Sequence, residues 1–268
     1  MLTLHPEALS PLVKWAGGKR RLVSEILEVA PSKFETYYEP FLGGGAVFFS
    51  ILPKWAVLAD ANRELVGMYL QIRDCPDQVI RFLGRLKNSE DDYYRIRSMR
   101  AKTKASQAAR LIYLCTLSFN GIYRQNLKGE FNVPYGNKDH LNPCDRENIA
   151  EISRKLRGRK LIEGDFEDTV SGAKQGDFVY FDPPYTVAHG NNGFVKYNAQ
   201  IFSWDDQMRL ARVASRLKRT GCNVIVSNAD HSSIRKLYSG FNVRVIKRHS
   251  VMAASTEFRR PVKECLFY

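Results

Sequence analysis

The run Asp182-Pro183-Pro184-Tyr185 directly follows an apolar segment, Phe178–Phe181, and it is the sharpest chemical signal in the chain. Two consecutive prolines fix the backbone and remove two N–H donors, so the turn is rigid and extended. Its own groups are therefore mainly acceptors, the Asp182 carboxylate and backbone carbonyls, with the flat ring of Tyr185 beside them. Acceptors next to an aromatic face suit a substrate that is an aromatic amine.

The amino nitrogen of adenine is a poor nucleophile because its lone pair is delocalised into the ring. The Asp182 carboxylate and the Pro183 carbonyl can accept its two hydrogens, which favours a tetrahedral nitrogen that can attack the methyl group of a sulfonium. These bonds strengthen as positive charge develops on the nitrogen, so they act in the transition state. Tyr185 would stack on the base and position it. The alternative is a structural turn with a solvated aspartate.

A glycine-rich turn, Gly43-Gly44-Gly45, comes after a short segment at 37–41 that reads as a strand, and Asp60 ends the next apolar segment at 56–59. Glycines after a strand allow a tight turn and close approach of a ligand, and an acid at the end of the next strand can bind ribose hydroxyls. The third glycine of a dinucleotide fingerprint is missing. The pattern therefore fits a nucleoside-bearing cofactor and a purely structural turn about equally well.

Alternating strands and helices must position these groups at one edge of a sheet. The expected strands are 37–41, 56–59, 161–164, Phe178–Phe181, 223–227, 242–246 and 265–268, and the expected helices are 20–30, 46–52 and 202–218. Residues 65–118 look helical, and 120–136 carry a loop or hairpin signal. This pattern predicts an α/β domain formed by residues 1–61 and 150–268, which is interrupted by an insertion at 62–149.

The composition favours a polyanionic partner. The 268 residues include 41 Lys and Arg against 28 Asp and Glu, a formal charge of +13, and the basic residues are spread over several segments. Such an excess favours binding to nucleic acid through phosphate neutralisation. At 44% hydrophobic residues, the chain can bury a sizeable core.

The sequence gives no sign of a membrane span, a secretion signal or a metal site. It contains no apolar run of 18 residues, and its first residues lack the features of a signal peptide. The five cysteines are scattered and the five histidines have no ligand spacing. We therefore expect a cytoplasmic protein that needs no metal.

Five motifs in this order resemble those of the Dam-type, D12 class, alpha-group DNA adenine N6-methyltransferases of bacteria and their phages. They are Lys14-Trp15-Ala16-Gly17-Gly18-Lys19, Glu39-Pro40-Phe41-Leu42-Gly43-Gly44-Gly45, Ala59-Asp60-Ala61-Asn62, Gly129-Glu130-Phe131-Asn132-Val133-Pro134-Tyr135-Gly136 and Asp182-Pro183-Pro184-Tyr185. The resemblance covers nearly the whole chain, and the combination is far more specific than any single motif.

The resemblance implies a Rossmann-like class I methyltransferase fold. We expect a mixed, mostly parallel sheet with an antiparallel last strand and an inserted helical target-recognition domain with a β-hairpin. The implied reaction is direct in-line transfer of a methyl group from S-adenosylmethionine to adenine N6 in double-stranded DNA, at GATC, after base flipping. We expect a monomer, encoded by a bacterium or by its phage. Mismatch-repair marking, restriction protection and phage self-protection share this chemistry.

The resemblance also implies roles for individual residues. Catalysis is assigned to Asp182, Pro183 and Tyr185. Cofactor binding is assigned to Trp15, Ala16, Gly17, Lys19, Pro40, Phe41, Gly43, Gly45, Asp60, Asp165, Phe166 and Asp182. DNA binding is assigned to Lys14, Phe119, Asn120, Ile122, Arg124, Asn132 and Pro134. Arg124 matches an arginine that reads a guanine, and Phe119 and Asn120 match residues that disturb the duplex near the flipped base. This chain departs from the family at Phe119, where Tyr is usual, and at Tyr123, where Cys or a similar residue is usual.

Other interpretations stay open at this point. A related enzyme could methylate cytosine N4, RNA or a protein glutamine, although the aspartate at 182 and the basic insertion weigh against these substrates. The chain could also be a non-catalytic DNA-binding module. At the level of single residues, Phe119 and Trp15 could be core residues, and Arg124 and Lys14 could contact phosphates.

Overall fold

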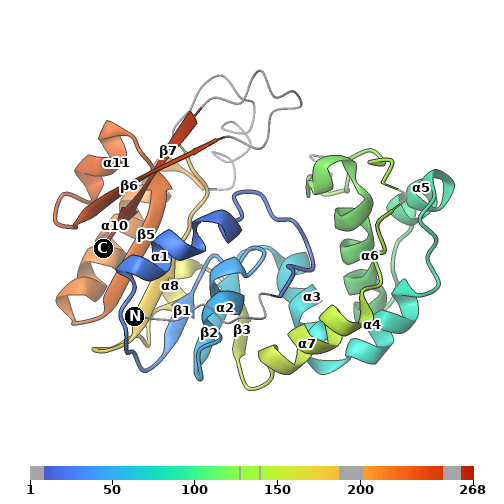
Figure 1. Cartoon of the computed structure of the whole chain (residues 1–268), viewed down its shortest axis with the longest axis horizontal. Coiled ribbons are helices and arrows are strands. Elements are labelled where there is room, and N and C mark those ends of the chain that lie inside the picture. The colour runs from blue at the N-terminus through green and yellow to red at the C-terminus, as the bar shows by residue number, and fades with distance from the viewer. Residues whose placement is uncertain (1–8, 127, 139, 187–201, 250–260) are drawn as a thin grey trace.

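The computed structural model describes residues 9–126, 128–138, 140–186, 202–249 and 261–268 (Figure 1). A strand-rich part on the left of Figure 1 is joined to a helical part on the right. The elements are η1 (Arg20–Leu22), α1 (Val23–Val29), β1 (Tyr37–Glu39), α2 (Ala46–Ile51), β2 (Ala56–Asp60), α3 (Arg63–Asp74), α4 (Pro76–Leu83), α5 (Glu90–Ser98), α6 (Lys104–Leu117), η2 (Phe119–Gly121), α7 (Arg146–Leu156), β3 (Lys160–Glu163), α8 (Phe166–Thr169), β4 (Phe178–Phe181), α10 (Trp204–Arg219), β5 (Asn223–Ala229), α11 (Ser232–Leu237), β6 (Val243–His249) and β7 (Pro261–Phe267).

The sheet has the strand order β3-β2-β1-β4-β5-β7-β6. The first five strands are parallel, and β7 pairs antiparallel with both β5 and β6. The predicted Rossmann-like arrangement, mostly parallel with an antiparallel last strand, is confirmed. The chain builds outward from β1 to β3 and then crosses to β4 on the other side of β1. Ligands of open α/β sheets bind at such a switch point, at the carboxyl ends of the strands.

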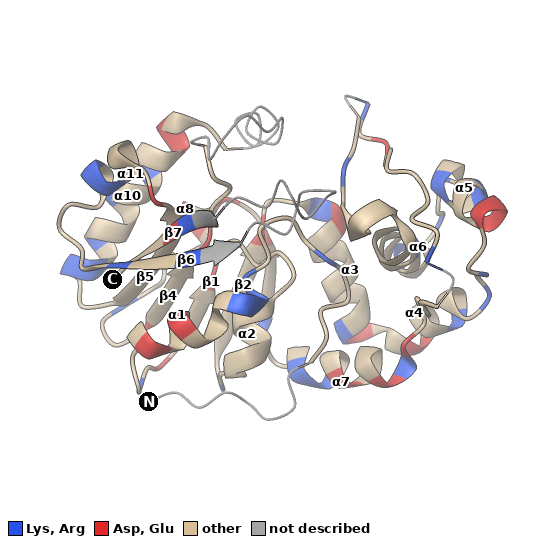
Figure 2. Cartoon of the chain, turned by 45° about the horizontal axis from the view of Figure 1, so that its top comes forward, with Lys and Arg blue, Asp and Glu red and all other residues tan. Residues whose placement is uncertain are grey.

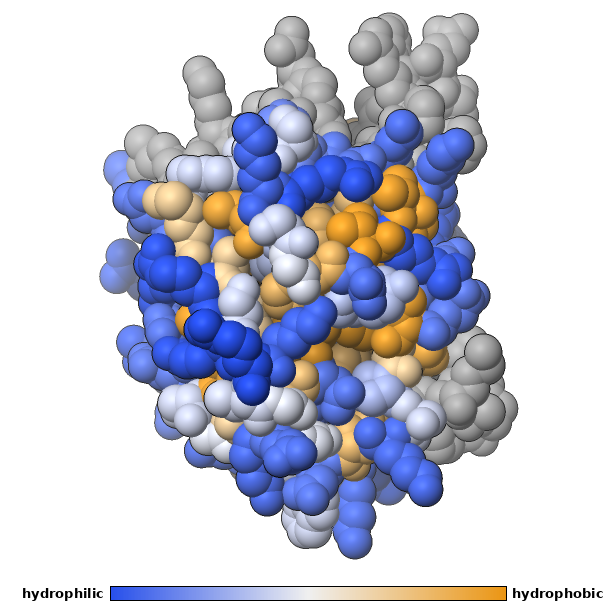
Figure 3. Space-filling model, turned by 90° about the vertical axis from the view of Figure 1, so that its left-hand side faces the viewer, coloured by the Kyte–Doolittle hydropathy of each residue, from blue (hydrophilic) through white to orange (hydrophobic). Residues whose placement is uncertain are grey.

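Strand residues alternate between two hydrophobic cores, one on each face of the sheet. Tyr37, Phe178 and Tyr180 belong to the core that contains residues of α1 and α2. Tyr38 and Val179 belong to the core that contains residues of α8, α10 and α11. The outer surface at the α10 and α11 end is largely hydrophilic, with small hydrophobic areas between polar side chains (Figure 3).

The helical part lies between β2 and β3 in the chain. The helices α3 to α7 form it, and α6 packs against α3, α4 and α5. Side chains of Asn62 and Thr103 cap α3 and α6, and both residue types are strongly favoured at N-caps. Helix α7 was not predicted, and the proposed domain boundary at 149–150 falls inside it. Since α7 packs mainly against α3 and α4, the two-part division of the chain stays a prediction.

The segment after α6 folds back on itself as an irregular hairpin. Isolated antiparallel bridges join Ser118 to Tyr135 and Gln125 to Phe131, without regular strands. The Phe119 N–H donates to the Pro134 carbonyl at 2.9 Å. The segment predicted as a loop or hairpin over 120–136 is thus a hairpin that isolated bridges hold together.

Several element ends differ from the prediction. Strand β1 stops at Glu39 rather than at 41, because Pro40 has no N–H to donate to a neighbouring strand. The short helices α8 and α11 were not predicted, since one or two turns leave too little periodicity to detect.

Candidate active site

Two motifs far apart in the sequence meet at the carboxyl edge of the sheet. The glycine turn follows β1 and the Asp-Pro-Pro-Tyr run follows β4, and these strands are parallel neighbours, with Tyr37 opposite Phe178. The structure thus places Gly43 and Asp182 at the same edge, next to the switch point. A cofactor bound at the glycine turn would therefore lie next to residues 182–185, which we call the Asp182 corner.

The glycine turn adopts a backbone that side chains would obstruct. Gly43 has a φ of +50° and Gly45 a φ of +69°, both in the left-handed region. A Cβ atom on Gly45 would lie 2.6 Å from the Phe49 ring, and one on Gly43 would lie 3.2 Å from the Trp15 ring. Glycine is therefore needed here both for conformation and for space.

The Asp60 carboxylate holds this turn from the next strand. Its oxygens accept hydrogen bonds from the Gly43 N–H at 3.0 Å and from the Asn62 N–H at 2.9 Å. Burial raises the pKa of Asp60, and the two N–H donors partly offset that effect. Each carboxylate oxygen can accept more than one hydrogen bond, so Asp60 can also receive a ligand hydroxyl.

The Asp182 corner contacts a cation, Lys19, that lies outside the Asp-Pro-Pro-Tyr motif. Lys19, only 3% exposed, places its Nζ 2.8 Å from Asp182 Oδ1, and the same Nζ donates to the Gly17 carbonyl at 2.8 Å. It also lies 4.9 Å from the centre of the Tyr185 ring. The resemblance implies that Lys19 binds the cofactor, and in the structure its ammonium group contacts the Asp182 carboxylate. An ion pair of this kind fixes the orientation of the aspartate.

Two buried glutamates adjoin the corner, and the sequence analysis assigned a role to neither. Glu264 of β7 accepts a hydrogen bond from the Tyr185 hydroxyl at 2.9 Å. Glu39, at the end of β1, accepts from the Tyr37 hydroxyl at 2.9 Å and from the Phe48 N–H at 3.1 Å. Burial raises the pKa of Glu39 to about 8. Acidic residues in otherwise apolar strands are a signal that could have found both.

The segment before α1 links the corner to the hairpin. The Trp15 indole lies against Gly43 and stacks on Tyr123, with ring centres 4.6 Å apart and an angle of 25° between the planes. Tyr123 is buried and donates its hydroxyl to Glu64 at 2.9 Å. Next to Trp15, the exposed Lys14 runs along Gly121. Ala16 is exposed, and Gly17 has a left-handed φ of +81°.

The residues around Asp165 form a third group at this edge. Arg209 of α10 holds Asp165 with two hydrogen bonds, of 2.9 and 2.6 Å. Its guanidinium also lies 4.3 Å from the centre of the Phe166 ring. Phe166 is buried, with Phe41 stacked on it at 5.5 Å. Phe166 therefore supports the wall of the site from inside the core, and Arg209, which the sequence analysis missed, orients the acid.

The predicted DNA contacts lie on the hairpin and next to it. Phe119 is 49% exposed, and Asn120 is exposed with a left-handed φ of +55°. Arg124 is exposed and donates its Nε to the Asn132 side chain at 2.8 Å, so two predicted contacts touch each other. Pro134 is exposed and Ile122 is half-buried. Phe119 is thus available to a partner, and the core interpretation of it is wrong.

A further lysine strengthens the positive charge of this surface. Lys138 donates its Nζ to the Ser118 carbonyl at 3.1 Å. Burial and then the nearby Lys14 ammonium lower the pKa of Lys138. Lysine and arginine residues also lie on both parts of the molecule (Figure 2). Lys138 lies outside the motifs, which is why the sequence analysis missed it.

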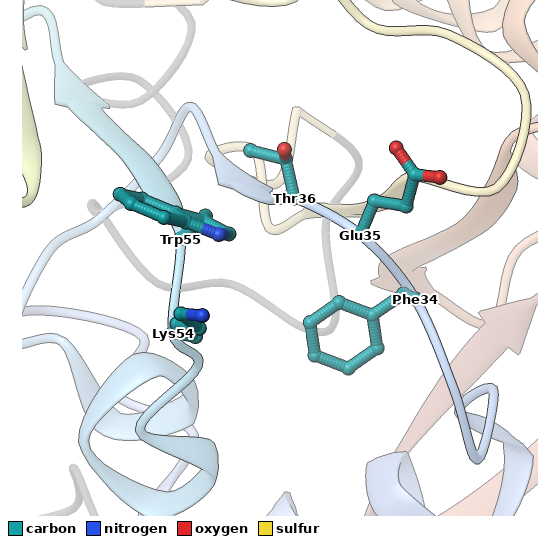
Figure 4. Close-up of a pocket in the computed structure, with 5 residues that line it drawn as sticks. All are labelled: Phe34, Glu35, Thr36, Lys54 and Trp55. Atoms are coloured by element: carbon teal, nitrogen blue, oxygen red, sulfur yellow. The ribbon is translucent and has the colours of Figure 1, made fainter.

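The cavity in Figure 4 lies elsewhere. It has a volume of about 580 Å³ and is lined by Phe34, Glu35, Thr36, Lys54 and Trp55. These residues directly precede β1 and β2, at the amino ends of the strands. The cavity is therefore at the edge opposite the glycine turn and Asp182, and it is no part of the candidate active site.

Neither a metal-ligand cluster nor a membrane-spanning helix is present in the described part of the chain. Among those residues, no group of three or more His, Cys, Asp or Glu side chains could hold a metal ion. None of the helices in the described ranges is long and apolar enough to cross a membrane.

Comparison with known proteins identifies the family. Residues 15–252 match the model of the D12 class N6 adenine-specific DNA methyltransferases. The chain is 38% identical to the type II methyltransferase M1.LlaDCHI of Lactococcus lactis subsp. cremoris, over 96% of this chain and 94% of the relative. It is 34% identical to the type II methyltransferase M.MjaIII of Methanocaldococcus jannaschii, over 89% and 91%. It is 30% identical to the DNA adenine methylase of Escherichia coli K12, over 95% and 93%. The predicted resemblance is confirmed: the chain belongs to the D12 class of N6 adenine-specific DNA methyltransferases.

Proposed function

We propose that this adenine-specific DNA methyltransferase uses S-adenosylmethionine to methylate adenine N6 at GATC in double-stranded DNA, by in-line transfer to a base flipped out of the helix. The observation that carries the proposal is the meeting of the glycine turn and the Asp182 corner at the switch point of the sheet. We also propose that 62–149 form the target-recognition part and that the enzyme acts as a monomer.

The residues at the glycine turn fit a methyl donor that carries a nucleoside. Gly43 and Gly45 hold the turn in its left-handed form against the Trp15 and Phe49 rings, and Asp60, which accepts from the Gly43 N–H, would also accept ligand hydroxyl groups. Trp15 packs against one side of the turn, and Asp165 follows β3 as the N-cap residue of α8. S-adenosylmethionine supplies an electrophilic methyl group on a sulfonium, so the reaction itself requires no metal. Ala16, Gly17, Pro40, Phe41 and Phe166 complete the proposed cofactor site.

The Asp182 corner would activate the adenine amino group. A carboxylate has about four acceptor positions, so Asp182 can bind Lys19 and the amino group at once. The Pro183 carbonyl would accept the second amino hydrogen. As positive charge develops on the nitrogen, both bonds strengthen, which is the condition for lowering the barrier. Tyr185 would stack on the base and hold it in place.

The hairpin surface would bind and open the duplex. The adenine amino group is inaccessible to a protein site within stacked DNA, so the base must leave the helix. The exposed Phe119 ring and Asn120, both in η2, would fill the space that it leaves. Arg124, oriented by Asn132, can donate two hydrogen bonds to guanine O6 and N7. Lys14, Ile122 and Pro134 are the further proposed contacts.

The GATC assignment comes from the family resemblance and carries two departures. Phe119 lacks the hydroxyl of the usual tyrosine, so it can wedge but cannot donate a hydrogen bond. Tyr123 stands where the family usually has a small residue. It is buried and stacks on Trp15, so it supports the proposed cofactor site through Trp15. Neither departure touches Asp182 or the glycine turn, so the proposed chemistry is retained.

The test is methylation of defined duplexes with methyl-labelled S-adenosylmethionine. We expect label in N6-methyladenine on nucleoside mass spectrometry, from GATC duplexes and not from duplexes with one changed base pair. Label in N4-methylcytosine, or label in RNA but not in DNA, would refute the proposal. Efficient methylation of adenine at a different site would overturn only the GATC assignment.

A further inference from the structure

Glu264 touches two groups of the catalytic corner without belonging to any motif. Its Oε2 accepts from the Tyr185 hydroxyl at 2.9 Å and lies 3.9 Å from the Lys19 Nζ. Lys19 in turn holds Asp182 at 2.8 Å. One carboxylate oxygen thus contacts both the aromatic residue and the cation that flank the catalytic aspartate.

We propose that Glu264 is a positioning residue for methyl transfer, which holds the Tyr185 ring and the Lys19 ammonium in the arrangement that the target base requires. This inference rests on the proposed roles of Asp182 and Tyr185. Glu264 does not touch the reacting atoms in the proposal, because it acts through Tyr185 and Lys19.

The antiparallel direction of β7 explains how a residue near the C-terminus reaches this edge. Glu264 lies opposite Ala229, the last residue of β5, and opposite Ile246 of β6. Since β7 runs against β5, residues near the start of β7 lie at the carboxyl ends of the parallel strands. Alternation along β7 places Glu264 on the same face as Leu266, in the core that contains residues of α1 and α2.

The burial of the Glu264 carboxyl opposes folding, so its presence here needs an explanation. It is 1% exposed and is followed by the buried apolar residues Cys265, Leu266 and Phe267. Taking an acid out of water is unfavourable unless it is hydrogen-bonded or paired, and an apolar residue in its place is often equally stable. Stability alone therefore does not explain a glutamate here, whereas a requirement to hold Tyr185 and Lys19 does.

A neighbouring pair provides a matched comparison. Tyr180 of β4 shares a 2.8 Å hydrogen bond with Ser227 of β5, which is also buried. This bond, like that of Glu264, ties a tyrosine of the β4 region to a different strand. Tyr180 lies inside β4 rather than in the corner, so Ser227→Ala removes a similar bond without loosening Tyr185.

The first experiment measures single-turnover methylation of a GATC duplex by the full-length enzyme. We expect Glu264→Ala to lower the rate constant by at least about tenfold, because small errors in position cost large factors in rate. Affinities for duplex and for S-adenosylmethionine should stay within about threefold of wild type, since Glu264 makes neither proposed contact. Glu264→Gln, which keeps an acceptor for Tyr185, should recover part of the rate. Ser227→Ala should keep the wild-type rate constant even if its unfolding midpoint falls.

A double-mutant cycle tests whether Glu264 acts through the Tyr185 hydroxyl. Tyr185→Phe keeps the ring and removes only the hydroxyl, so it should lower the rate by part of the Glu264→Ala effect. Combining Tyr185→Phe with Glu264→Ala should then cost much less than the product of the two single effects, because each change removes the same hydrogen bond. Glu264→Leu, which also removes the acceptor but fills the space, keeps the cycle usable if Glu264→Ala does not fold.

The outcomes separate this inference from the proposed function. If wild-type enzyme forms no N6-methyladenine, or if Asp182→Ala and Tyr185→Ala keep full rate, the proposed function fails. If those variants are inactive but Glu264→Ala and Glu264→Gln behave like Ser227→Ala, Glu264 is merely structural and the inference is overturned. Independent, multiplicative effects in the cycle would also overturn it.

Discussion

The buried carboxyl of Glu39 predicts a specific dependence of stability on pH. Glu39 is 2% exposed, and one of its oxygens accepts from the Tyr37 hydroxyl and the Phe48 N–H. Burial is the largest cause that raises its pKa from an ordinary 4.5 to about 8, and the Tyr37 hydrogen bond opposes this rise. The carboxyl is therefore protonated in the folded protein at neutral pH.

The sign of the effect follows from proton binding. Between about pH 4.5 and pH 8 the unfolded chain has released this proton while the folded chain retains it. Unfolding therefore releases a proton, and the contribution of Glu39 to the free energy of unfolding falls as the pH rises, by about 1.4 kcal/mol per pH unit. Below this window both states are protonated and the contribution is constant.

The variant Glu39→Gln tests this dependence, because a glutamine resembles the protonated acid and cannot titrate. We expect the stability of the variant relative to wild type to increase by about 3 kcal/mol between pH 5.5 and pH 7.5, because two pH units are spanned. Urea denaturation of both proteins at several pH values measures this difference, in which the other titrating groups cancel.

A second variant checks the cause. Tyr37→Phe removes the hydrogen bond that lowers the pKa of Glu39, so in that background the dependence on pH should extend to higher pH. A stability difference between Glu39→Gln and wild type that is constant with pH, or that shrinks as the pH rises, would show that Glu39 is not protonated in the folded protein at neutral pH.

Three further predictions concern the site. Tyr123→Leu removes the ring that stacks on Trp15, and such an aromatic pair contributes about 0.5–1.5 kcal/mol. Calorimetry should therefore show about 2- to 12-fold weaker binding of S-adenosylmethionine to this variant, whereas Tyr123→Phe should bind it normally. Lys19→Met leaves the Asp182 carboxylate without its buried cation. The free energy of unfolding, measured with urea, should fall by about 3–5 kcal/mol, and a stability equal to wild type would disprove the importance of the pair. Arg124→Ala should reduce discrimination at one guanine by about 1–3 kcal/mol in competition binding, and a uniform loss on all duplexes would instead indicate a phosphate contact.

Local sequence patterns predicted much of the fold because they reflect local physics. Strand β4 was predicted with its observed bounds, since four apolar residues are bounded by a turn signal and two prolines. The meeting of Gly43 and Asp182 was also predictable, because both follow strands of a parallel sheet and such sheets place ligands at the carboxyl ends.

The partners of Asp182 were not predictable in the same way. Lys19 and Glu264 lie at opposite ends of the chain, and their meeting with Asp182 depends on β7 entering the sheet between β5 and β6. No local pattern specifies that pairing. Likewise, Tyr123 was recognised as a departure from the family, but its stacking on Trp15 depends on how the hairpin folds over the segment before α1.

The proposed role of Asp182 is tested by measuring single-turnover methyl transfer with Asp182→Ala. With saturating S-adenosylmethionine and an excess of enzyme over GATC duplex, we expect a rate constant about 10²- to 10³-fold below that of wild type, because an acceptor that stabilises the charge of the transition state is lost. Duplex affinity should be retained, since Asp182 makes no proposed contact with the DNA backbone. Methylation of adenine by this variant at the wild-type rate would show that Asp182 does not activate the amino group.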